Sequence, residues 1–530
     1  MKQAYKLTLV LCGVWIFSLL YGEMFAYWLP SLYSCSWPHL LPSSKENGFM
    51  HSNKYVKVAV LADPQLMDKT SLPLPPKSLS LELVQFYTDL YMRRAFFASI
   101  LPFKPDVIVF LGDYFDGGPY LNDEEWKESL ERFRHSFGLD SGGKIADIPV
   151  YFIPGNHDIG YESVYSHLPQ IMQRYEKEFG VRNYRFTVGK VEFVAIDAQT
   201  LDGNRQGTFS SVTWDFIKNV SSDTQSIPRV LLTHIPLFRQ DNSYCGPHRC
   251  SPIINQRILR SAQSQEVRYQ NYVSEESSVG LLNLIRPILV LSGHDHDQCA
   301  VTHEARHKPV PELTLGTISW QQGNLYPSFM LLSAIDSENA NVSTPEEAVM
   351  TQLCFLPMQT HIYIWYISLF CLTILALLFW PTSGVNFEPC FCGLRACIKQ
   401  WCSMFTQATK EKNEDDDCEY EMMFDAEGSM HLVKKPRETP KSQQSGGSSI
   451  ERGNAVMRPK RNIQQETEVS MNIDMSADIG YDTRLRHRAG KSKTKIIVHR
   501  LLRTFQMLTI IAAVNVPLYM MMLFKDWVNK

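Results

Sequence analysis

Seven short runs of aliphatic and β-branched residues recur between residues 56 and 333 of this chain, and longer stretches of helical pattern separate them. In order, the runs are VKVAVLA, DVIVFLG, PVYFIPG, VEFVAID, RVLLTH, PILVLSG and FMLLS. This alternation predicts an α/β fold. Because each run is almost entirely apolar, we expect strands buried on both faces, in central sheets covered by helices. Residues 79–101, between the first two runs, are predicted to form a helix.

Most of these runs end in a short polar cluster. The clusters are Asp63-Pro64-Gln65, Gly112-Asp113-Tyr114-Phe115-Asp116, Gly155-Asn156-His157-Asp158, Thr233-His234 and Gly293-His294-Asp295-His296. Open α/β sheets place their sites at the carboxyl ends of strands, so we expect these loops to converge on one crevice. Taken singly, each cluster could instead be a turn or a helix cap. Five of them in this order favour a shared site.

The side chains in these clusters are carboxylates, amides and imidazoles. Structural zinc sites are closed tetrahedral sets rich in cysteine, which these clusters lack. Oxygen and nitrogen donors of this kind suit Mn, Fe or Zn in an open, catalytic site. The pattern therefore predicts metal-dependent catalysis.

The order D-x-[H/Q], GDxxD, GNHD, H and GHxH resembles that of the calcineurin-like metallophosphoesterases, and the resemblance covers about residues 56–335. It implies two mixed sheets between layers of helices, a four-layer α/β sandwich, with a dinuclear metal centre. It also implies the ligands: one metal ion would be held by Asp63, Gln65, Asp113 and His296, and the other by Asn156, His234, His294 and the shared Asp113. Two cations about 3.5–4 Å apart can both polarise a phosphoryl oxygen and activate a hydroxide nucleophile.

By the same resemblance, His157 is the general acid that protonates the leaving oxygen, and Asp116 orients its imidazole. The neighbouring Asp158 and Asp295 have two open readings. Each could hydrogen-bond a metal-ligating histidine, or each could be a turn residue.

Two positions depart from the family pattern. Gln65 stands where many relatives have histidine, and its neutral amide is a poorer donor, which favours a harder ion such as Mn. Gly117 follows Asp116 where the protein Ser/Thr phosphatases of the superfamily carry a phosphate-binding arginine. This second departure argues against a phosphoprotein substrate.

Three apolar segments are predicted to span a membrane. Residues 7–28 form a retained signal anchor, with a cleaved signal peptide as the alternative. Residues 362–380 are an uncharged run with aromatic residues at both ends. Residues 505–524 are interrupted by Gln506, Asn515 and Pro517, so a re-entrant or interfacial helix is the alternative there.

Basic residues orient these segments. Lys2 and Lys6 place residues 1–6 in the cytosol, and basic clusters such as Lys434-Lys435 do the same for residues 381–503. That second stretch is acidic and then rich in Lys, Pro, Ser, Gly and Gln, which predicts a largely disordered loop. The domain at residues 50–340 then lies in the lumen.

Features of residues 50–340 agree with a lumenal position. Sequons at Asn219 and Asn341 predict glycosylation, and Cys245 and Cys250 are close enough for a disulfide, with a free pair as the alternative. The net charge of −3 gives no general attraction to nucleic acid, and we expect no nucleic-acid partner.

Further stretches, GNHDIG, EKEF, PLFRQDNSYCGPHR and NYVSEESSVGLLNLIRPILVLSGHDH, are similar to the eukaryotic metallophosphoesterases that remodel glycosylphosphatidylinositol (GPI) anchors. This narrower resemblance implies removal of ethanolamine phosphate from a mannose, two Mn ions, and action between the endoplasmic reticulum (ER) and the Golgi. The partners it implies are GPI-anchored proteins as substrates, membrane lipids and the ER-export cargo machinery. Arg239 and Arg249 are candidate phosphate or glycan contacts, with solvated loop arginines as the alternative.

Two other functions stay open. One is a lumenal phosphodiesterase or phosphatase for another lipid, nucleotide or sugar phosphate. The other is a non-catalytic cargo adaptor on the same fold, which loss of metal ligands would favour; only Gln65 departs from the ligand pattern.

Overall fold

The computed structural model describes most of the 530-residue chain. The described residues are 2–40, 55–139, 145–205, 207–223, 227–249, 253, 258–323, 326–336, 348–380, 420–424, 430–434 and 493–528. The chain divides into one unit of Met1–Val385 with Arg503–Lys530 and a second unit of Asn386–Leu502. Most of the predicted disordered loop at 381–503 lies outside the described residues. Within it the structure describes an antiparallel hairpin of β14 (Tyr420–Phe424) and β15 (Met430–Lys434).

Two mixed sheets form the centre of the first unit. The five-stranded sheet has the order β13 (Val349–Phe355), β12 (Ser328–Ile335), β1 (Tyr55–Leu61), β2 (Val107–Phe110) and β3 (Val150–Phe152). Its strands β1, β2 and β3 are parallel, and β12 and β13 run antiparallel to their neighbours. Because β13 belongs to this sheet, the fold continues past residue 340, where the sequence places the end of the domain.

The six-stranded sheet has the order β10 (Cys299–His303), β11 (Val310–Thr314), β9 (Leu289–Ser292), β6 (Arg229–Leu232), β5 (Val191–Ala195) and β4 (Tyr184–Val188). Its inner strands are parallel, and β4 and β10 are antiparallel edges. A separate small hairpin joins β7 (Ile258–Arg260) and β8 (Val267–Gln270). All seven predicted runs form strands, so the predicted sheets are confirmed. The edge strands β4 and β10 escape prediction because their exposed side chains break the apolar runs.

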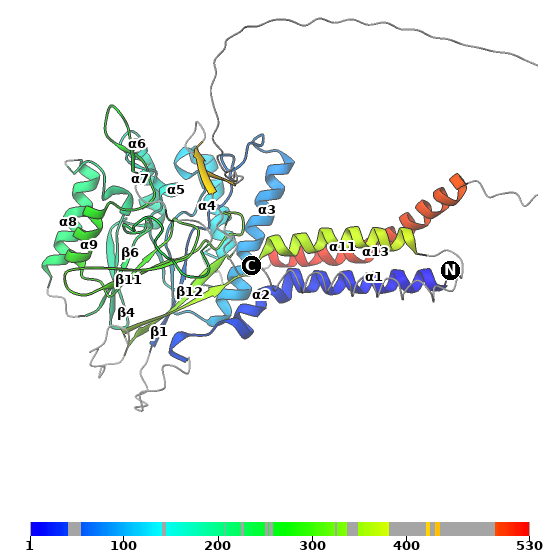
Figure 1. Cartoon of the computed structure of the whole chain (residues 1–530). Helices are drawn as coiled ribbons and strands as arrows, with labels where there is room; N and C mark the ends of the chain where they lie inside the picture. Colours follow the sequence, from blue (N-terminus) through cyan, green and yellow to red (C-terminus); the bar gives the residue numbers. More distant parts are fainter. Residues whose placement is uncertain are drawn as a thin grey trace, which may run out of the picture. The chain divides into compact units, whose positions relative to one another are not determined.

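Strand β1 shows how the layers are held together. Its Val58 and Val60 pack between the two sheets, whereas Ala59 and Leu61 face a second core shared with helices. The helices of the domain are α3 (Leu79–Arg94), α4 (Asp123–Phe137), α5 (Asn156–Ile159), α6 (Glu162–Tyr165), α7 (Gln170–Phe179), α8 (Thr208–Ser222) and α9 (Glu275–Ile285). Residues of α3, α4 and α7 cover the five-stranded sheet, and residues of α8 and α9 cover the other (Figure 1). The predicted four-layer sandwich is the observed fold.

Helix α3 is shorter than the sequence predicts for residues 79–101. After Arg94 the chain continues as a π-helical turn, Ala95–Ile100, and a 3-10 turn, Leu101–Phe103. The hydrophobic face of this segment is continuous, which is why the sequence reads as one helix.

Among the described residues, three helical segments are long and apolar enough to cross a membrane: Tyr5–Ser34, Gln359–Phe379 and Ile497–Val528. The first comprises α1 (Lys2–Leu20), a π turn (Tyr21–Phe25), α2 (Ala26–Leu29) and a second π turn (Pro30–Ser34). The others are α11 (Gln359–Phe379) and α13 (Lys493–Val528). They lie side by side in Figure 1, and the indole of Trp15 on α1 donates to Thr373 Oγ1 on α11 at 3.0 Å.

Helix α13 is continuous through the residues that made its prediction ambiguous. The side-chain amide of Asn515 donates to the carbonyl of Ile511 at 2.9 Å, one turn earlier, which satisfies part of its polarity inside the helix. Near the start of α13, Arg503 contacts the carbonyl of Trp380 at 2.7 Å, just after α11 ends. Near its other end, Asp526 pairs with Arg94 of α3 at 2.8 Å. Between Arg503 and Asp526, α13 therefore runs antiparallel to α11 (Figure 1).

Buried charges join the three long apolar helices to the domain. Glu23, in the first span, is 3% exposed and forms an ion pair with Arg94, which also pairs with Asp526. The hydroxyl of Tyr366 on α11 donates to Glu23 at 2.9 Å. We call Glu23, Arg94, Asp526 and Tyr366 the charged junction. A disulfide between Cys35, after the first span, and Cys354, before the second, lies at the same end of the helices.

Candidate metal centre

The polar loops after β1, β2, β6 and β9 meet at one place. Two groups of side chains there could each hold a metal ion: Asp63, Asp113 and His296 in one, and Asp113, His234 and His294 in the other. Within each group the donor atoms lie within 4.8 Å of one another. Asp113 belongs to both groups, as the resemblance implies for a bridging carboxylate.

The backbone of these loops is held in an unusual conformation. Five site residues have positive φ: Asp63 at 51°, Gln65 at 38°, Asp113 at 55°, His294 at 70° and His296 at 56°. Left-handed geometry costs a residue with a side chain about 1–3 kcal/mol and persists only where the surroundings enforce it. Hydrogen bonds between the loops do so. The amide of Gln65 donates to the carbonyl of Asp113 at 2.8 Å, and that of His294 to Asp63 Oδ1 at 3.0 Å.

Asp158 is the main clamp on these loops. Its carboxylate is 2% exposed and accepts hydrogen bonds from the amides of Asp113, Tyr114 and Gly155, each at 2.8 Å. It contacts no histidine side chain among the hydrogen bonds of the described residues. Asp158 therefore supports the backbone of the Asp113 loop, a role that neither open reading from the sequence contained.

Gly112 allows the loops to approach so closely. Its φ is +104°, and a Cβ added there would lie 2.6 Å from Nδ1 of His234. No other residue fits without displacing that imidazole. The glycine before Asp113 is thus a steric requirement of the site.

Asn156, at the start of α5, and His234, after β6, form the other side of the site. His234 Nε2 lies 3.1 Å from Asn156 Oδ1 and 3.2 Å from Asp113 Oδ2. Its Nδ1 lies 2.7 Å from the carbonyl of Leu111, which orients the ring so that Nε2 faces the other ligands.

The histidines and carboxylates of the site have shifted pKa values. Burial lowers the pKa of His294 to about 3 and that of His296 to about 4, so both imidazoles are neutral at pH 7, as metal ligation requires. Burial raises the pKa of Asp63 to about 8, because nothing nearby compensates fully for its lost hydration. The Asp113 carboxylate outweighs the effect of burial on His234 and raises its pKa to about 9, so this imidazole must release a proton to bind a metal ion.

The donor set fits two divalent ions. Both Asp63 and Asp113 are fully buried, yet within the described part of the chain neither has a Lys or Arg within 4.0 Å. The amide oxygen of Gln65 is also buried and has no hydrogen-bond partner there, while its nitrogen donates to Asp113 Oδ2 at 3.1 Å. A metal ion supplies both the missing charge and the missing partner.

Comparison with known proteins agrees with this geometry. Residues 56–298 match the family described as calcineurin-like phosphoesterase. These residues are a calcineurin-like phosphoesterase domain. The match covers the strands that carry all the metal ligands, so this domain has the fold and the donor set of a metal-dependent phosphoesterase.

Sequence similarity to known proteins extends beyond this domain. Cell division control protein 1 of Saccharomyces cerevisiae is 29% identical over 351 residues, which cover 62% of this chain and 67% of the yeast protein. Metallophosphoesterase 1 of Pongo abelii is 27% identical over 419 residues, which cover 76% of this chain and 96% of that protein. Among solved structures, phosphopantetheinyl hydrolase of Mycobacterium tuberculosis is 14% identical with a TM-score of 0.26, over 50% of this chain and 90% of that one.

His157 is the predicted general acid of the phosphoesterase domain, and 36% of its side chain is exposed. Its Nδ1 hydrogen-bonds the backbone carbonyl of Asp116, and the Asp116 carboxylate lies 3.7 Å away. Burial opposes protonation, but the carboxylates of Asp113 and Asp116 outweigh it and raise the pKa of His157. Asp116 thus contacts the ring through its carbonyl as well as its charge, which leaves Nε2 for a substrate.

Gly117 has a steric explanation. A Cβ at this position would collide with the Thr70 hydroxyl, and the Gly117 amide donates to Asp68 Oδ2 at 2.7 Å. Asp68, which sequence reasoning missed, is 4% exposed and binds the amide of Thr70 as well, at 2.8 Å. The phosphate-binding arginine of the Ser/Thr phosphatases therefore has no room here.

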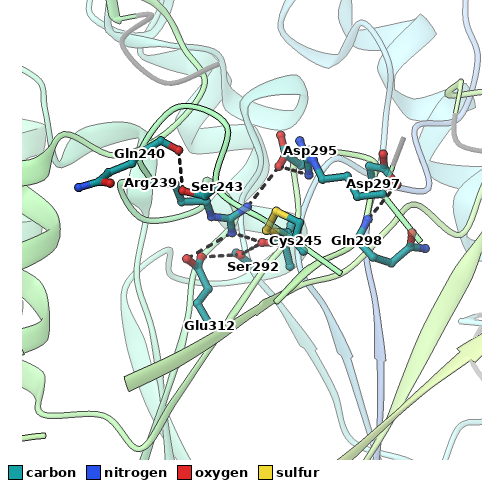
Figure 2. Close-up of a disulfide and its surroundings, with 12 residues drawn as sticks. Arg239, Gln240, Ser243, Cys245, Ser292, Asp295, Asp297, Gln298 and Glu312 are labelled. Carbon is teal, nitrogen blue, oxygen red and sulfur yellow. Dashed lines mark hydrogen bonds and ion pairs between the residues drawn. A yellow bond between two sulfur atoms is a disulfide. The ribbon is translucent and has the colours of Figure 1, made fainter. Parts of the chain in front are cut away.

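Arg239 and Arg249, the candidate substrate contacts, are both buried and both pair with Asp295. Figure 2 shows Arg239 between Asp295, at 3.3 Å, and Glu312, at 3.2 Å. Arg249 lies 2.7 Å from Asp295 Oδ2, and the hydroxyl of Tyr272 donates to the same carboxylate at 3.1 Å. The reading as solvated loop arginines is wrong, since their side chains are 1% and 5% exposed. Contact with substrate stays a prediction.

Asp295 therefore orients two arginines and a tyrosine and does not act as a simple turn residue. It stands between His294 and His296, so this ionic network fixes the loop that carries both ligands. Tyr272 and Glu312 were not predicted, because strand pairing and packing bring them here from elsewhere in the sequence.

The disulfide of this region differs from the expected one. Cys245 pairs with Cys299, at the start of β10, and not with Cys250, which lies outside the described residues. Figure 2 shows Cys245 beside the Arg239 network. Of the predicted glycosylation sites, Asn219 is exposed on α8, and Asn341 lies outside the described residues.

Proposed function

We propose that this phosphoesterase removes ethanolamine phosphate from a mannose of GPI anchors while GPI-anchored proteins travel from the ER to the Golgi. The observation that carries the proposal is the attachment of a complete two-metal site to three helices of membrane-spanning length through the charged junction. Such an arrangement favours a phosphoester that is itself lipid-linked. The narrower sequence resemblance supports the ethanolamine phosphate linkage and Mn as the metal.

A lumenal orientation of the domain is part of the proposal. The C-terminal end of the first span, the start of α11 and the end of α13 all lie at the domain, so the basic residues Lys2 and Lys6 lie at the far end of the helices. Two disulfides, Cys35–Cys354 and Cys245–Cys299, occur on the domain side and support an oxidising compartment. The ER and Golgi provide one.

The residues divide the chemistry between them. Asp63, Gln65, Asp113 and His296 would hold one ion, and Asn156, His234, His294 and Asp113 the other. When bound, the two ions act as Lewis acids that activate water and stabilise charge on the phosphoryl oxygens. On the leaving side, the partly exposed imidazole of His157 donates its Nε2 proton to the sugar oxygen as the phosphorus–oxygen bond breaks. Asp116 keeps the ring in place by accepting from Nδ1.

The test is to analyse GPI glycans by mass spectrometry in cells that lack the protein and in cells rescued with wild type or Asp113→Asn. Asp215→Asn is the matched control, because Asp215 is an exposed carboxylate on α8 that pairs with Lys218 at the surface. We expect an extra ethanolamine phosphate in the null cells, cleared by wild type and by Asp215→Asn but not by Asp113→Asn.

Each other outcome has a defined meaning. Identical glycans in all cells reject the GPI substrate and leave a metallophosphoesterase for another phosphoester. Clearance by Asp113→Asn as efficient as by wild type rejects catalysis at this site and favours a cargo adaptor.

A further inference from the structure

A cavity of about 610 Å³ lies between the three membrane helices and α3. Its walls are mainly apolar and aromatic, and include Trp15 of α1, Val84 of α3, Phe370 of α11 and Leu508 of α13. Its volume is that of a pocket for a small organic ligand. Since three of its four walls are helices long enough to cross a bilayer, an occupant can reach it from the hydrocarbon region.

Two polar atoms in the wall have no partner. The side-chain oxygen of Asn515 and the indole nitrogen of Trp320 are both buried, and neither has a hydrogen-bond partner within the described residues. Asn515 as a whole is 5% exposed. A buried acceptor and a buried donor without partners are costly, and here both belong to residues that line the same cavity. The cavity thus suits a hydrocarbon chain that carries polar groups at one end.

The segment that carries Trp320 also supports the metal centre. The hydroxyl of Thr317 donates to the carbonyl of Asp63 at 2.6 Å, and the side chain of Gln321 donates to the carbonyl of Gln65 at 3.1 Å. Trp320, between them, packs edge-on against Tyr363 of α11 at a centroid distance of 5.6 Å. One short segment therefore contacts the Asp63–Gln65 loop on one side and forms the cavity wall on the other.

We propose that this cavity holds the hydrocarbon chain of the lipid-linked substrate while its phosphoester lies at the metal centre. The inference rests on the proposed function in that it takes the substrate to be lipid-linked. Lipid tails are as apolar as the cavity wall, so hydrophobic transfer from the bilayer contributes little. The advantage is positional, because a held chain raises the effective concentration of the phosphoester at the ligands. Asn515 and Trp320 add selectivity for the polar linkage at the head of the chain.

Neighbouring alanines on α13 provide a matched pair for the test. Both alanines are exposed, and of the two only Ala512 lines the cavity. Purified full-length protein in nanodiscs would be assayed on a GPI glycolipid and on bis(4-nitrophenyl) phosphate, which has no lipid. In Ala512→Trp we expect the ratio of kcat/KM for the glycolipid to that for the soluble diester to fall at least about tenfold, mainly through KM. In Ala513→Trp the ratio stays at the wild-type value. Equal ratios in the two variants overturn the proposal.

Asn515→Leu keeps the test valid if tryptophan at 512 disrupts folding. It removes the unpartnered oxygen without adding a ring, and it too should raise KM for the glycolipid. If neither variant changes this KM, the cavity does not bind the chain.

A binding measurement distinguishes the substrate chain from bulk lipid. A GPI glycolipid with a photoactivatable acyl chain is added to Asp113→Asn protein, with a phosphatidylcholine carrying the same chain as comparison. Preferential labelling of α11 and α13 by the glycolipid, lost on adding Ala512→Trp, supports the proposal. Equal labelling by phosphatidylcholine overturns it, because the cavity is then an ordinary lipid site.

Failure of the proposed function gives a different pattern. If wild type cleaves another lipid-linked phosphoester but spares ethanolamine phosphate, the GPI assignment is rejected, and the Ala512 and Ala513 variants are compared on that substrate. If wild type cleaves the GPI glycolipid and the two variants do so equally well, only the cavity proposal is rejected.

Discussion

The metal centre and the charged junction both bury ionisable side chains, but they neutralise them in opposite ways. In the junction, Glu23 and Asp526 both pair with Arg94, so the protein supplies its own counter-charge. In the metal centre, Asp63 and Asp113 lie fully buried, and among the described residues they have histidines but no Lys or Arg within 4.0 Å. Buried charge balanced by the chain indicates structure, and buried charge left unbalanced indicates a ligand.

The backbone repeats this contrast. The junction residues lie in helices, whereas five residues of the metal centre have positive φ. Backbone strain from positive φ persists at functional sites, where the geometry of the site is kept at a cost in stability. The two regions should therefore respond differently when an ionisable side chain is replaced by an uncharged one.

The largest effect is expected at His157 in the metal centre. His157→Asn should lower kcat about 10²–10⁴-fold for a sugar phosphodiester, because the sugar alkoxide must be protonated as it leaves. For bis(4-nitrophenyl) phosphate the loss should be much smaller, since nitrophenolate leaves without a proton. Steady-state kinetics on both substrates give the measurement. His167→Asn, at a histidine with 68% of its side chain exposed, is the control. Equal losses of kcat on both substrates would show that His157 positions the substrate and does not protonate the leaving oxygen.

At the junction the expected effect is on stability. Arg94→Met should reduce the free energy of unfolding by about 3–5 kcal/mol, because it leaves Glu23 buried without its partner. Thermal unfolding in nanodiscs measures this as a lower Tm. Arg94→Met with Glu23→Leu should recover part of the loss, whereas Asp113→Asn in metal-free protein should not lower Tm. An unchanged Tm for Arg94→Met would contradict the contrast between the two regions.

A smaller effect is expected at Gln65. Gln65→Ala should weaken metal binding about 10–100-fold, by removing the unpartnered amide oxygen, as isothermal titration calorimetry can show. Gln65→His should shift preference from Mn toward Zn or Fe, because imidazole suits those ions better. Gln173→Ala, at an exposed position on α7, should change nothing. Equal Mn affinity in Gln65→Ala and wild type would remove Gln65 from the site.

The ion pairs drawn in Figure 2 predict how the stability of the domain depends on pH. Burial alone would raise the pKa of Glu312, but Arg239 and His303 outweigh it and lower the pKa from 4.5 to about 2. A lowered pKa contributes stability that is present above the unfolded value and lost as pH falls from about 4.5 toward 2. Acid unfolding followed by circular dichroism should therefore be less steep over this window in Glu312→Gln. Glu276→Gln, at a carboxylate with 77% of its side chain exposed, should follow wild type. If Glu312→Gln and wild type had the same acid-unfolding profile, the Arg239–Glu312 ion pair would not contribute to stability over this pH range.

The sequence predicts the central strands and the loops after them because apolar runs and strand-end polar residues are local patterns. The residues that hold those loops are less visible. Asp158 reads as a turn residue until the amides of Asp113 and Gly155 are seen around it. The Cys245–Cys299 disulfide depends on the position of β10, whereas sequence spacing favours the nearer Cys250.

No local sequence pattern predicts the cavity between the helices. Its walls come from α1, α3, α11 and α13, which are separated by most of the chain. Each helix is recognisable from its own apolar run. The space between them is set by packing, and Asn515, which makes the prediction of α13 as a span ambiguous, is one of the residues that line that space.

The residues of the charged junction are synthesised far apart in time. Translation delivers the first span with Glu23, then α3 with Arg94, then α11, and α13 with Asp526 only after more than a hundred further residues. Until α13 arrives, the cavity lacks a wall and Arg94 lacks one of its two carboxylates. The strands that carry the metal ligands are all made before α13, so we expect the domain to fold first and the helices to close the cavity in a second stage.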